Sequence, residues 1–286
     1  MKVKTTIIIL VSIFLASWII GGILSAFSNV DSYGNVALIP ITGTIMTGND
    51  GFSSGSSSTW VVNQIDKANN DPSIKAVIFE INSGGGGAVA SEEIALAIQR
   101  LSKPSVAWVR EIAASGAYWA AASTDKIYSS RISIIGSVGV FSSGIDVSGF
   151  MNDHNITYNR IVAGKYKDIG IPLKEMTPKE EQILQSNIDQ IHEYFLDEIA
   201  RLRNLDNNTR EEISSAKIYI GQEALDLGLV DEIGTKIDVI NYLSKDLNTS
   251  ITVKEYAQKE SFLETISKLS FPMKNFLLDN NLKVFT

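Results

Sequence analysis

The sequence has no cysteine and only two histidines, His154 and His192, among its 286 residues. Without cysteine the chain cannot form a disulfide, a thiolate zinc site or a cysteine nucleophile. A Ser-His-Asp triad would have to use one of the two histidines. Positive charge is also scarce, because 25 Lys and Arg face 32 Asp and Glu, which gives a net charge of -7. This balance argues against a nucleic-acid-binding surface, which needs clustered Lys and Arg.

Residues 5–30 contain no charged side chain, and their apolar part runs from position 7 to position 24. A helix needs ~20 such residues to cross a bilayer, whereas the apolar region of a signal peptide usually has only ~7 to 15. We therefore favour an uncleaved signal anchor, with a cleaved signal as the alternative. Lys2 and Lys4 precede the apolar run, so the positive-inside rule places the short N-terminus in the cytoplasm. The sequence thus predicts a single-pass protein of the cell membrane with an extracytoplasmic domain.

The chain divides into three parts on this interpretation. Residues 1–30 form the cytoplasmic N-terminus and transmembrane anchor, residues 31–256 the extracytoplasmic domain, and residues 257–286 a C-terminal tail. The tail gathers Phe, Ile and Leu residues around Pro272. We interpret it as a helix that packs on its own or a neighbouring subunit. Contact with the membrane surface is the alternative, because amphipathic helices with aromatic residues bind there.

Residues 31–256 alternate short apolar runs with amphipathic stretches, which predicts strands joined by helices. Connections of this length between strands imply parallel pairing through crossover helices, and hence an α/β fold. Strands are predicted at 36–41, 76–81, 105–109, 126–128 and 156–162. Helices are predicted at 59–69 and 88–101, from about Ser115, from 178 to about 205, and at 221–228. The Gly/Ser-rich stretch 47–59 is predicted to be a surface loop.

The helix that starts at Pro178 has the clearest sequence signal. Thr177 supplies an N-cap, Pro178 occupies the first helical position, and Glu180 completes a capping box.

Four consecutive glycines, Gly84 to Gly87, lie between a predicted strand and a predicted helix. Glycine lets the backbone turn through positive φ and brings N–H groups close to a ligand. A phosphate site is excluded, because neither the G-x-x-x-x-G-K-[ST] nor the G-x-G-x-x-G pattern is present. A flexible loop remains one interpretation. The other is that a glycine N–H forms half of an oxyanion hole for a carbonyl substrate.

Small residues surround Ser115 at the start of an alanine-rich helix. Such a serine is often only an N-cap. The functional interpretation is a nucleophile, with the N–H of Gly116 as a second oxyanion donor.

Lys165 and Lys167 follow the apolar run 156–162 and are rivals for the role of a general base. Lysine can replace histidine in a serine hydrolase when its amine is held neutral. Residues two apart share a face of an extended chain, so periodicity does not choose between them.

These segments together resemble the bacterial and archaeal signal peptide peptidase family in its short, single-unit form. The resemblance covers about residues 36–234, and a more distant one extends to the Clp protease and crotonase fold. It rests on the order and spacing of four segments: Asn-Ser-x-Gly-Gly at 82–86, Ala-Ser-Gly-x-Tyr at 114–118, Gly-Ser-Val-Gly-Val at 136–140 and Lys-Asp at 167–168. The family loop commonly has proline where this chain has Gly84, which raises the entropy of the unfolded loop and leaves the dyad intact.

The resemblance implies a function and a site residue by residue. Ser115 would be the nucleophile, Lys167 the base, and Ser137 the hydroxyl that orients the lysine, while Gly86 and Gly116 would supply the oxyanion N–H groups. Lys165 then falls outside the motif. The implied fold is an α/β, Clp protease/crotonase-like core of repeated ββα units with a parallel sheet. No metal and no cofactor are needed.

The implied activity is that of a membrane-anchored serine endopeptidase. Its substrates would be signal peptides left after secretion, cut in their apolar core, together with other apolar peptides. The implied assembly is a homo-oligomeric ring, an octamer, in which Ser115 meets Lys167 of a neighbouring subunit. Three alternatives stay open: a related protease that cleaves stomatin-like membrane proteins, an acyl-CoA hydratase or thioesterase, and a scaffold without enzymatic activity.

Overall fold

The structure is a computed structural model that describes residue 12 and residues 33–48 and 55–256. The apolar run at 7–24 and the C-terminal tail lie outside the described residues, so the structure tests neither prediction. Within the described ranges no helix combines the length and the apolar character needed to cross a bilayer.

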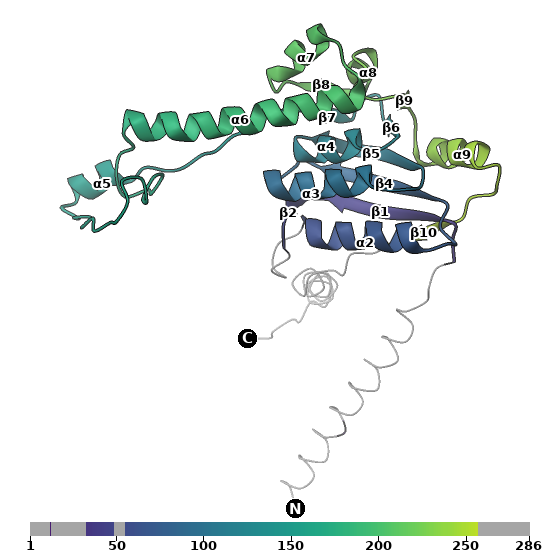
Figure 1. Cartoon of the computed structure of the whole chain (residues 1–286), viewed down its shortest axis with the longest axis horizontal. Helices are drawn as coiled ribbons and strands as arrows, with labels where there is room; N and C mark the ends of the chain where they lie inside the picture. The colour runs from purple at the N-terminus through teal and green to yellow at the C-terminus, as the bar shows by residue number, and fades with distance from the viewer. Residues whose placement is uncertain (1–11, 13–32, 49–54, 257–286) are drawn as a thin grey trace, which may run out of the picture.

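The described chain is organised around one 8-stranded sheet (Figure 1). Its main path runs in the order β10-β1-β4-β5-β6-β9, and every pair along this path is parallel. The strands of the path are β1 (Val36–Thr42), β4 (Ala76–Ser83), β5 (Ser105–Ala114), β6 (Lys126–Ser129), β9 (Glu232–Ile233) and β10 (Val253–Glu255). β7 (Ile134–Gly136) pairs in parallel with the C-terminal end of β5. Its other neighbour, β8 (Ile218–Ile220), runs antiparallel to it. The predicted mixed α/β fold with a largely parallel sheet is confirmed.

Helices cover both faces of this sheet. α2 (Ser58–Asn70), α3 (Ala88–Gln99) and α4 (Gly116–Ala122) pack on one face, where Ile39, Phe79 and Val109 belong to the larger apolar cluster. α9 (Lys236–Asp246) packs on the other face, against alternate residues of the same strands such as Leu38 and Ile78. Burial from both sides explains why β1 and β4 appear in the sequence as continuous apolar runs.

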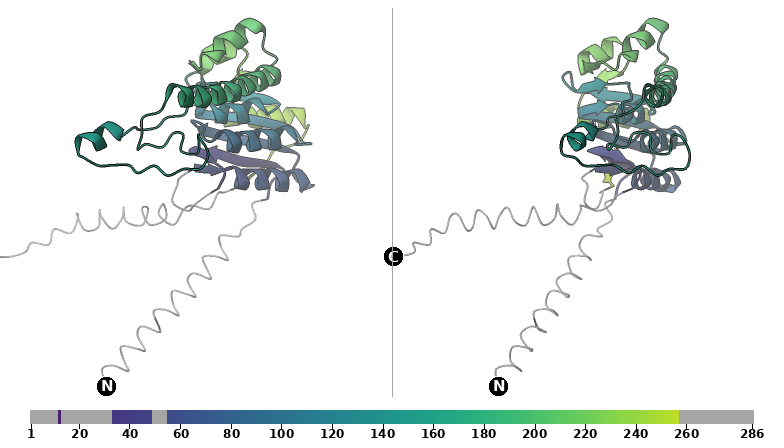
Figure 2. Two further views of the ribbon diagram at one scale, coloured as in Figure 1. Left: turned by 60° about the vertical axis from the view of Figure 1, so that its left-hand side comes forward. Right: turned by 90° about the vertical axis from the view of Figure 1, so that its left-hand side faces the viewer.

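Residues 139–177 project from this sheet, and we call them the arm. The other described elements, apart from α6, we call the body. The arm contains one short helix, α5 (Ser148–Asp153), and α6 (Pro178–Arg203) returns from its far end to the body (Figures 1 and 2). α6 packs on α4 and is followed by α7 (Asn207–Ser214) and α8 (Gly221–Asp226). No residue from 139 to 177 is buried.

The predicted start of α6 is confirmed in detail. The backbone N–H of Thr177 donates to Glu180 Oε2 at 2.9 Å, and the N–H of Glu180 donates to Thr177 Oγ1 at 3.3 Å. This capping box satisfies two backbone donors that the helix itself leaves free.

The predicted strand at 156–162 is wrong. The segment has no strand assignment and pairs with no other strand of the described chain. It lies on the arm, where no neighbouring strand is available to take its backbone hydrogen bonds.

The predicted surface loop 47–59 is wrong at its C-terminal end. Residues 55–57 form β3 (Gly55–Ser57), which pairs with β2 (Thr44–Met46), and α2 already begins at Ser58. Ser56, Ser57 and Ser58 are buried, which is tolerated because their hydroxyls form hydrogen bonds. Ser56 Oγ, for example, donates to Thr42 O at 3.0 Å.

Candidate active site

Ser115 lies at the turn between β5 and α4 and has an unusual backbone. Its φ is 54° and its ψ is −130°, a region that residues with a side chain rarely adopt. The turn is held by the N–H of Ser115, which donates to Gly136 O at 2.8 Å, and by Tyr118 N, which donates to Ser115 O at 2.9 Å. The Ser115 hydroxyl makes no hydrogen bond within the described chain and lines a groove. The hydroxyl is therefore free to meet a ligand.

The glycine loop is clamped between this turn and β2. Gly85 has a φ of +96°, and a Cβ there would lie 2.8 Å from the Ser115 Cβ. Gly86 forms a parallel bridge with Ile45, and a Cβ on Gly86 would lie 2.0 Å from Ile45 O. Ile45 N donates to Gly85 O at 3.0 Å, and Gly87 N donates to Ile45 O at 2.9 Å. The interpretation of these glycines as a flexible loop is therefore wrong.

Two backbone N–H groups meet beside Ser115. A Cβ on Gly116 would lie 3.9 Å from the Gly86 nitrogen, which places these two glycines next to each other. The Gly86 N–H lies between the two bridge hydrogen bonds and donates to no acceptor in the described ranges. Gly116 is the first residue of α4, where a helix supplies no acceptor for the N–H. The pair therefore offers free donors of the kind that bind a developing oxyanion.

Ser137 lies in the same groove and also has a positive φ, of 53°. It follows Gly136, whose carbonyl holds the Ser115 turn, and its own N–H donates to Lys217 O at 3.0 Å. The groove has a volume of about 1230 Å³ and passes between β2, the glycine loop and the start of the arm. The structure thus brings together Ser115, Ser137 and Gly86 from three separate segments.

A smaller hollow of about 220 Å³ continues from Ser115 towards α6. Ser115, Gly86 and Gly116 line its mouth. Its other walls are mostly apolar and come from α4, the start of the arm and α6: Trp119, Val140, Phe141, Ile191 and Phe195. The sequence analysis assigned none of these residues. The four-residue spacing of Ile191 and Phe195 predicts that they share a helix face. It does not predict that this face lines a hollow beside Ser115.

Lys167 does not reach Ser115 within the chain. It lies in a turn of the arm at 164–170, is exposed, and lines neither hollow that contains Ser115. Its N–H donates to Gly164 O at 3.2 Å. The rival Lys165 is also exposed and places its Nζ 5.1 Å from the centre of the Tyr166 ring. The serine and lysine elements are therefore held by different parts of the molecule.

Neither histidine contacts Ser115. His192 Nε2 lies 3.1 Å from Val138 O and, because a carbonyl only accepts, donates a hydrogen bond to it. His154 lies on the arm, where its Nδ1 is 2.8 Å from Phe150 O. The arrangement of a Ser-His-Asp triad is thus missing from the part of the chain that the structure describes. The same residues hold no cluster of three or more His, Cys, Asp or Glu that could bind a metal ion.

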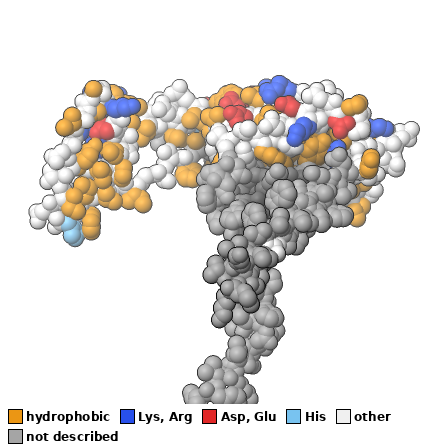
Figure 3. All heavy atoms as spheres, turned by 90° about the horizontal axis from the view of Figure 1, so that it is seen from below, with side chains coloured by type: hydrophobic (Ala, Val, Ile, Leu, Met, Phe, Trp, Pro, Cys, Tyr) orange, Lys and Arg blue, Asp and Glu red, His pale blue; other side chains and the backbone are white. Residues whose placement is uncertain are grey.

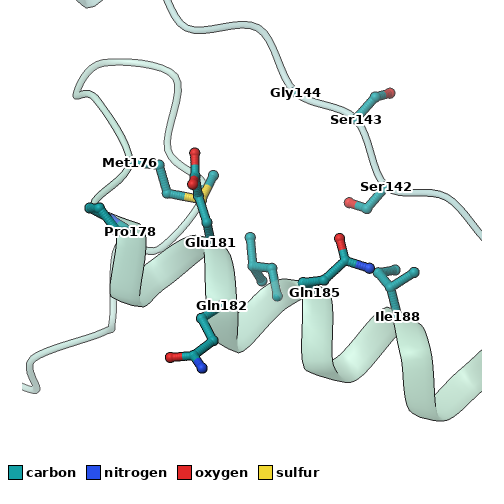
Figure 4. A pocket seen from close by; sticks show the side chains of 11 residues that line it. Ser142, Ser143, Gly144, Met176, Pro178, Glu181, Gln182, Gln185 and Ile188 are labelled. Carbon is teal, nitrogen blue, oxygen red and sulfur yellow. The ribbon is translucent and has the colours of Figure 1, made fainter.

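The arm has a separate hollow of about 520 Å³ (Figure 4). It lies between residues 142–144 and the start of α6, where Met176, Glu181 and Gln185 contribute side chains. It shares no lining residue with the Ser115 groove.

Comparison with known proteins places this chain in a family. A protein of Methanocaldococcus jannaschii described as a candidate protease is 38% identical over 205 residues, which cover 71% of this chain and 66% of the relative. A candidate signal peptide peptidase SppA of Enterococcus faecium is 34% identical over 197 residues, which cover 68% of this chain and 57% of the relative. The chain thus spans between half and two thirds of the length of these two relatives.

The fold also matches a solved structure, that of a mutant of a membrane-bound stomatin-specific protease. The TM-score is 0.50 at 19% identity, over 78% of this chain and 98% of the other. At this identity the likeness concerns the fold alone. Residues 97–250, more than half of the chain, match the family described as Peptidase family S49. The resemblance to signal peptide peptidases is confirmed, and the chain belongs to peptidase family S49.

Proposed function

We propose that the protein is a membrane-anchored serine endopeptidase in which Ser115 attacks a peptide carbonyl. One observation carries this proposal: an unbonded serine hydroxyl lies on a strained turn beside two free backbone N–H groups, in an open groove. A strained backbone at a ligand site is a common feature of catalytic turns. The anchor is the apolar run at 7–24, which would keep the enzyme at the cell membrane with its domain outside the cytoplasm.

Gly86 and Gly116 would stabilise the tetrahedral intermediate through their N–H groups. Removal of one such donor typically lowers the rate by ~10²- to 10³-fold. Both donors lie in the segments that flank Ser115 in the structure, and the Gly86 nitrogen lies 3.9 Å from the position of a Cβ on Gly116.

Lys167 would be the general base, supplied by a neighbouring subunit. Lys167 lies on the arm and lines neither hollow that contains Ser115. The arm also exposes large apolar side chains, including Phe141 at 87%, Ile145 at 78% and Ile161 at 99%. Figure 3 shows hydrophobic side chains gathered on the part of the molecule that projects from the body. Exposed apolar surface of this kind marks an interaction site. A head-to-tail contact in which the arm covers the next body would complete the dyad, and such contacts close into rings, here an octamer.

The proposed reaction is acyl transfer followed by hydrolysis. The Ser115 hydroxyl proton passes to the neutral amine of Lys167 as the bond from Oγ to the carbonyl carbon forms. The resulting ammonium gives this proton to the leaving amine as the peptide bond breaks. Water then attacks the acyl-enzyme and its proton passes to Lys167. The Lys167 ammonium returns this proton to Ser115 Oγ as the bond from Oγ to the acyl carbon breaks and the product acid leaves. Ser137, in the same groove, would orient the lysine amine.

The apolar hollow beside Ser115 supports an apolar substrate residue at the cleavage site. Trp119 lines this hollow and stacks against Phe195, with 5.0 Å between the ring centres. A walled volume of about 220 Å³ fits an aliphatic or aromatic side chain. Leftover signal peptides, cut within their apolar core, are the substrates we propose. Stomatin-like membrane proteins are the second candidate, favoured by the fold likeness to a stomatin-specific protease.

The full chain, purified from membranes, would be assayed with a fluorogenic apolar peptide and labelled with a fluorophosphonate probe. Ser115→Ala and Lys167→Ala should each abolish hydrolysis, while Lys165→Ala serves as the matched control and should retain activity. Lys167→Arg should also be inactive, because a guanidinium stays protonated. Full hydrolysis by Ser115→Ala would refute Ser115 as the nucleophile, whereas a wild-type protein that neither hydrolyses the peptide nor takes up the probe would favour a scaffold.

Coexpression of Ser115→Ala with Lys167→Ala tests the contact between subunits. In randomly mixed head-to-tail rings about a quarter of the interfaces pair an intact serine with an intact lysine, so activity should return. No recovery in verified mixed oligomers would place the dyad within one chain.

A further inference from the structure

The turn that carries Lys167 is tied to the rest of the arm by a two-pronged ion pair. Arg160 Nε donates to Asp168 Oδ2 at 2.6 Å, and Arg160 Nη2 donates to Asp168 Oδ1 at 2.9 Å. The same Nη2 lies 3.4 Å from Lys165 O. A bidentate arginine fixes direction as well as distance, because both partners are planar. Arg160 therefore closes the turn from the adjoining segment.

The backbone of the turn supplies less restraint than this pair. Its three hydrogen bonds, from the N–H groups of Lys167, Ile169 and Ile171, are 3.2 to 3.3 Å long, at or beyond the usual limit for N–H···O bonds. The Asp168 side chain is only 10% exposed, although the surrounding arm has no buried residue. The carboxylate is thus enclosed, while its partner Arg160 stays 42% exposed.

Nearly every charge around the turn has a partner in this structure. Arg160 pairs with Asp168, and Lys174 pairs with Glu180 at 2.8 Å. Lys165 lies over the Tyr166 ring. Among these four cations only Lys167 has neither an anionic nor an aromatic partner within the described ranges. Geometry therefore separates the two lysines that the sequence left as rivals.

We propose that Arg160 and Asp168 are positioning residues for Lys167: their two-pronged pairing fixes the turn that carries this lysine. This inference rests on the proposed role of Lys167 as the base. The pair acts through the backbone, because Asp168 is the next residue in the chain and the hydrogen bonds of the turn itself are long. The hydrogen bond from Arg160 also lowers the pKa of Asp168, so the pair stays ionised throughout the working range.

Other charged groups near the turn do not replace Arg160 in this role. Lys174 acts on Asp168 only weakly and at a distance, since Glu180 already binds it. Tyr158 and Glu180 are the remaining titratable groups that act on Arg160. Loss of Arg160 would therefore leave Asp168 with no ion-pair partner within the described ranges.

The test is the steady-state kinetics of the full chain on the fluorogenic apolar peptide. Arg160→Gln should lower kcat about tenfold with little change in KM, because a displaced base slows the chemical step without changing peptide binding. Asp168→Asn should do the same, and the double variant Arg160→Gln with Asp168→Asn should lose no more than either single variant, because the two residues act as one pair. Arg110→Gln breaks a comparable pair on the body, Arg110 to Glu80 at 2.9 Å, and should leave kcat unchanged.

An unchanged kcat in Arg160→Gln, or losses that add up in the double variant, would overturn the inference. Lys167→Ala, assayed alongside, tests the base assignment separately. Activity in Lys167→Ala refutes the base assignment itself, whereas an inactive Lys167→Ala together with a wild-type kcat in Arg160→Gln refutes only the positioning role.

Discussion

The body and the arm of this protein differ in how they hold their functional groups. In the body, Ser115 and the glycine loop are fixed by strands and helices with fully buried side chains such as Phe79 and Tyr118. In the arm no residue from 139 to 177 is buried, and Lys167 depends on a turn closed by one ion pair. The serine side of the proposed dyad is thus complete within one chain, while the lysine side has a surface that still needs a partner.

A matched pair of Phe→Ala substitutions should separate the two regions most strongly. Phe79 is fully buried in the larger core cluster, so Phe79→Ala should lower the free energy of unfolding by ~3 to 5 kcal/mol through lost burial and a residual cavity. Phe141 is 87% exposed, so Phe141→Ala should change it by less than ~0.5 kcal/mol in the isolated subunit. Chemical unfolding measures both.

Subunit association should be affected more by Phe141→Ala than by Phe79→Ala. Phe141→Ala should weaken subunit association and peptide hydrolysis, measured by sedimentation and by turnover, since Phe141 also lines the groove. Equal destabilisation of the subunit by both substitutions would show that the arm is packed within its own chain, and the comparison would fail.

A second pair tests the body at the glycine loop. Gly86→Ala places a methyl group 2.0 Å from Ile45 O, so the loop must shift and its N–H must leave its place beside Gly116. Peptide hydrolysis should fall by ~10²- to 10³-fold, the usual effect of losing one oxyanion donor. Gly84→Ala is the control, because nothing lies within 4 Å of a Cβ at Gly84 and its φ is not in the left-handed region. Comparable losses in both variants would argue against a specific role for the Gly86 N–H.

The smallest effect is expected at the junction between the arm and α6. The hydrogen bond from Lys174, followed by those from Thr177, lowers the pKa of Glu180 from 4.5 to about 2. Since the folded pKa lies below the unfolded one, the stabilisation is complete above about pH 4.5 and is lost as the pH falls towards 2. The first turn of α6 should therefore fray in this window.

Hydrogen exchange of the backbone amides in the first turn of α6 measures this loss of stabilisation. The reference is Glu180→Gln, a variant without the carboxylate. Glu180→Gln should expose these amides already at neutral pH and show no further change down to pH 2. Glu181→Gln removes the same charge from the same turn without touching the capping box, and should behave like the wild type. A wild-type profile in Glu180→Gln would show that the pair does not hold the junction.

Some features of the structure follow from contacts between residues close in sequence. The Thr177–Glu180 box predicts where α6 begins, because a cap needs only groups three residues apart. Apolar runs predict β1 and β4 within one or two residues, because burial on both sides of a parallel sheet excludes polar residues. The order of the motifs predicts the family. The segment 156–162 shows the limit of such patterns, since an apolar run forms a strand only where another strand lies beside it.

The sequence by itself determined the family and the alternation of strands and helices from β4 to β6, and it nominated the residues proposed for the site. Only the tertiary structure decided how these residues meet. The adjacency of Gly86 and Gly116 depends on a bridge to Ile45 and on the packing of α4 against the loop. The positive φ of Ser115 depends on a hydrogen bond to Gly136 from another strand. The physical reason is range: caps and periodicity act within a few residues, whereas a site assembled from β2, β4, β5 and β7 exists only once those strands have packed.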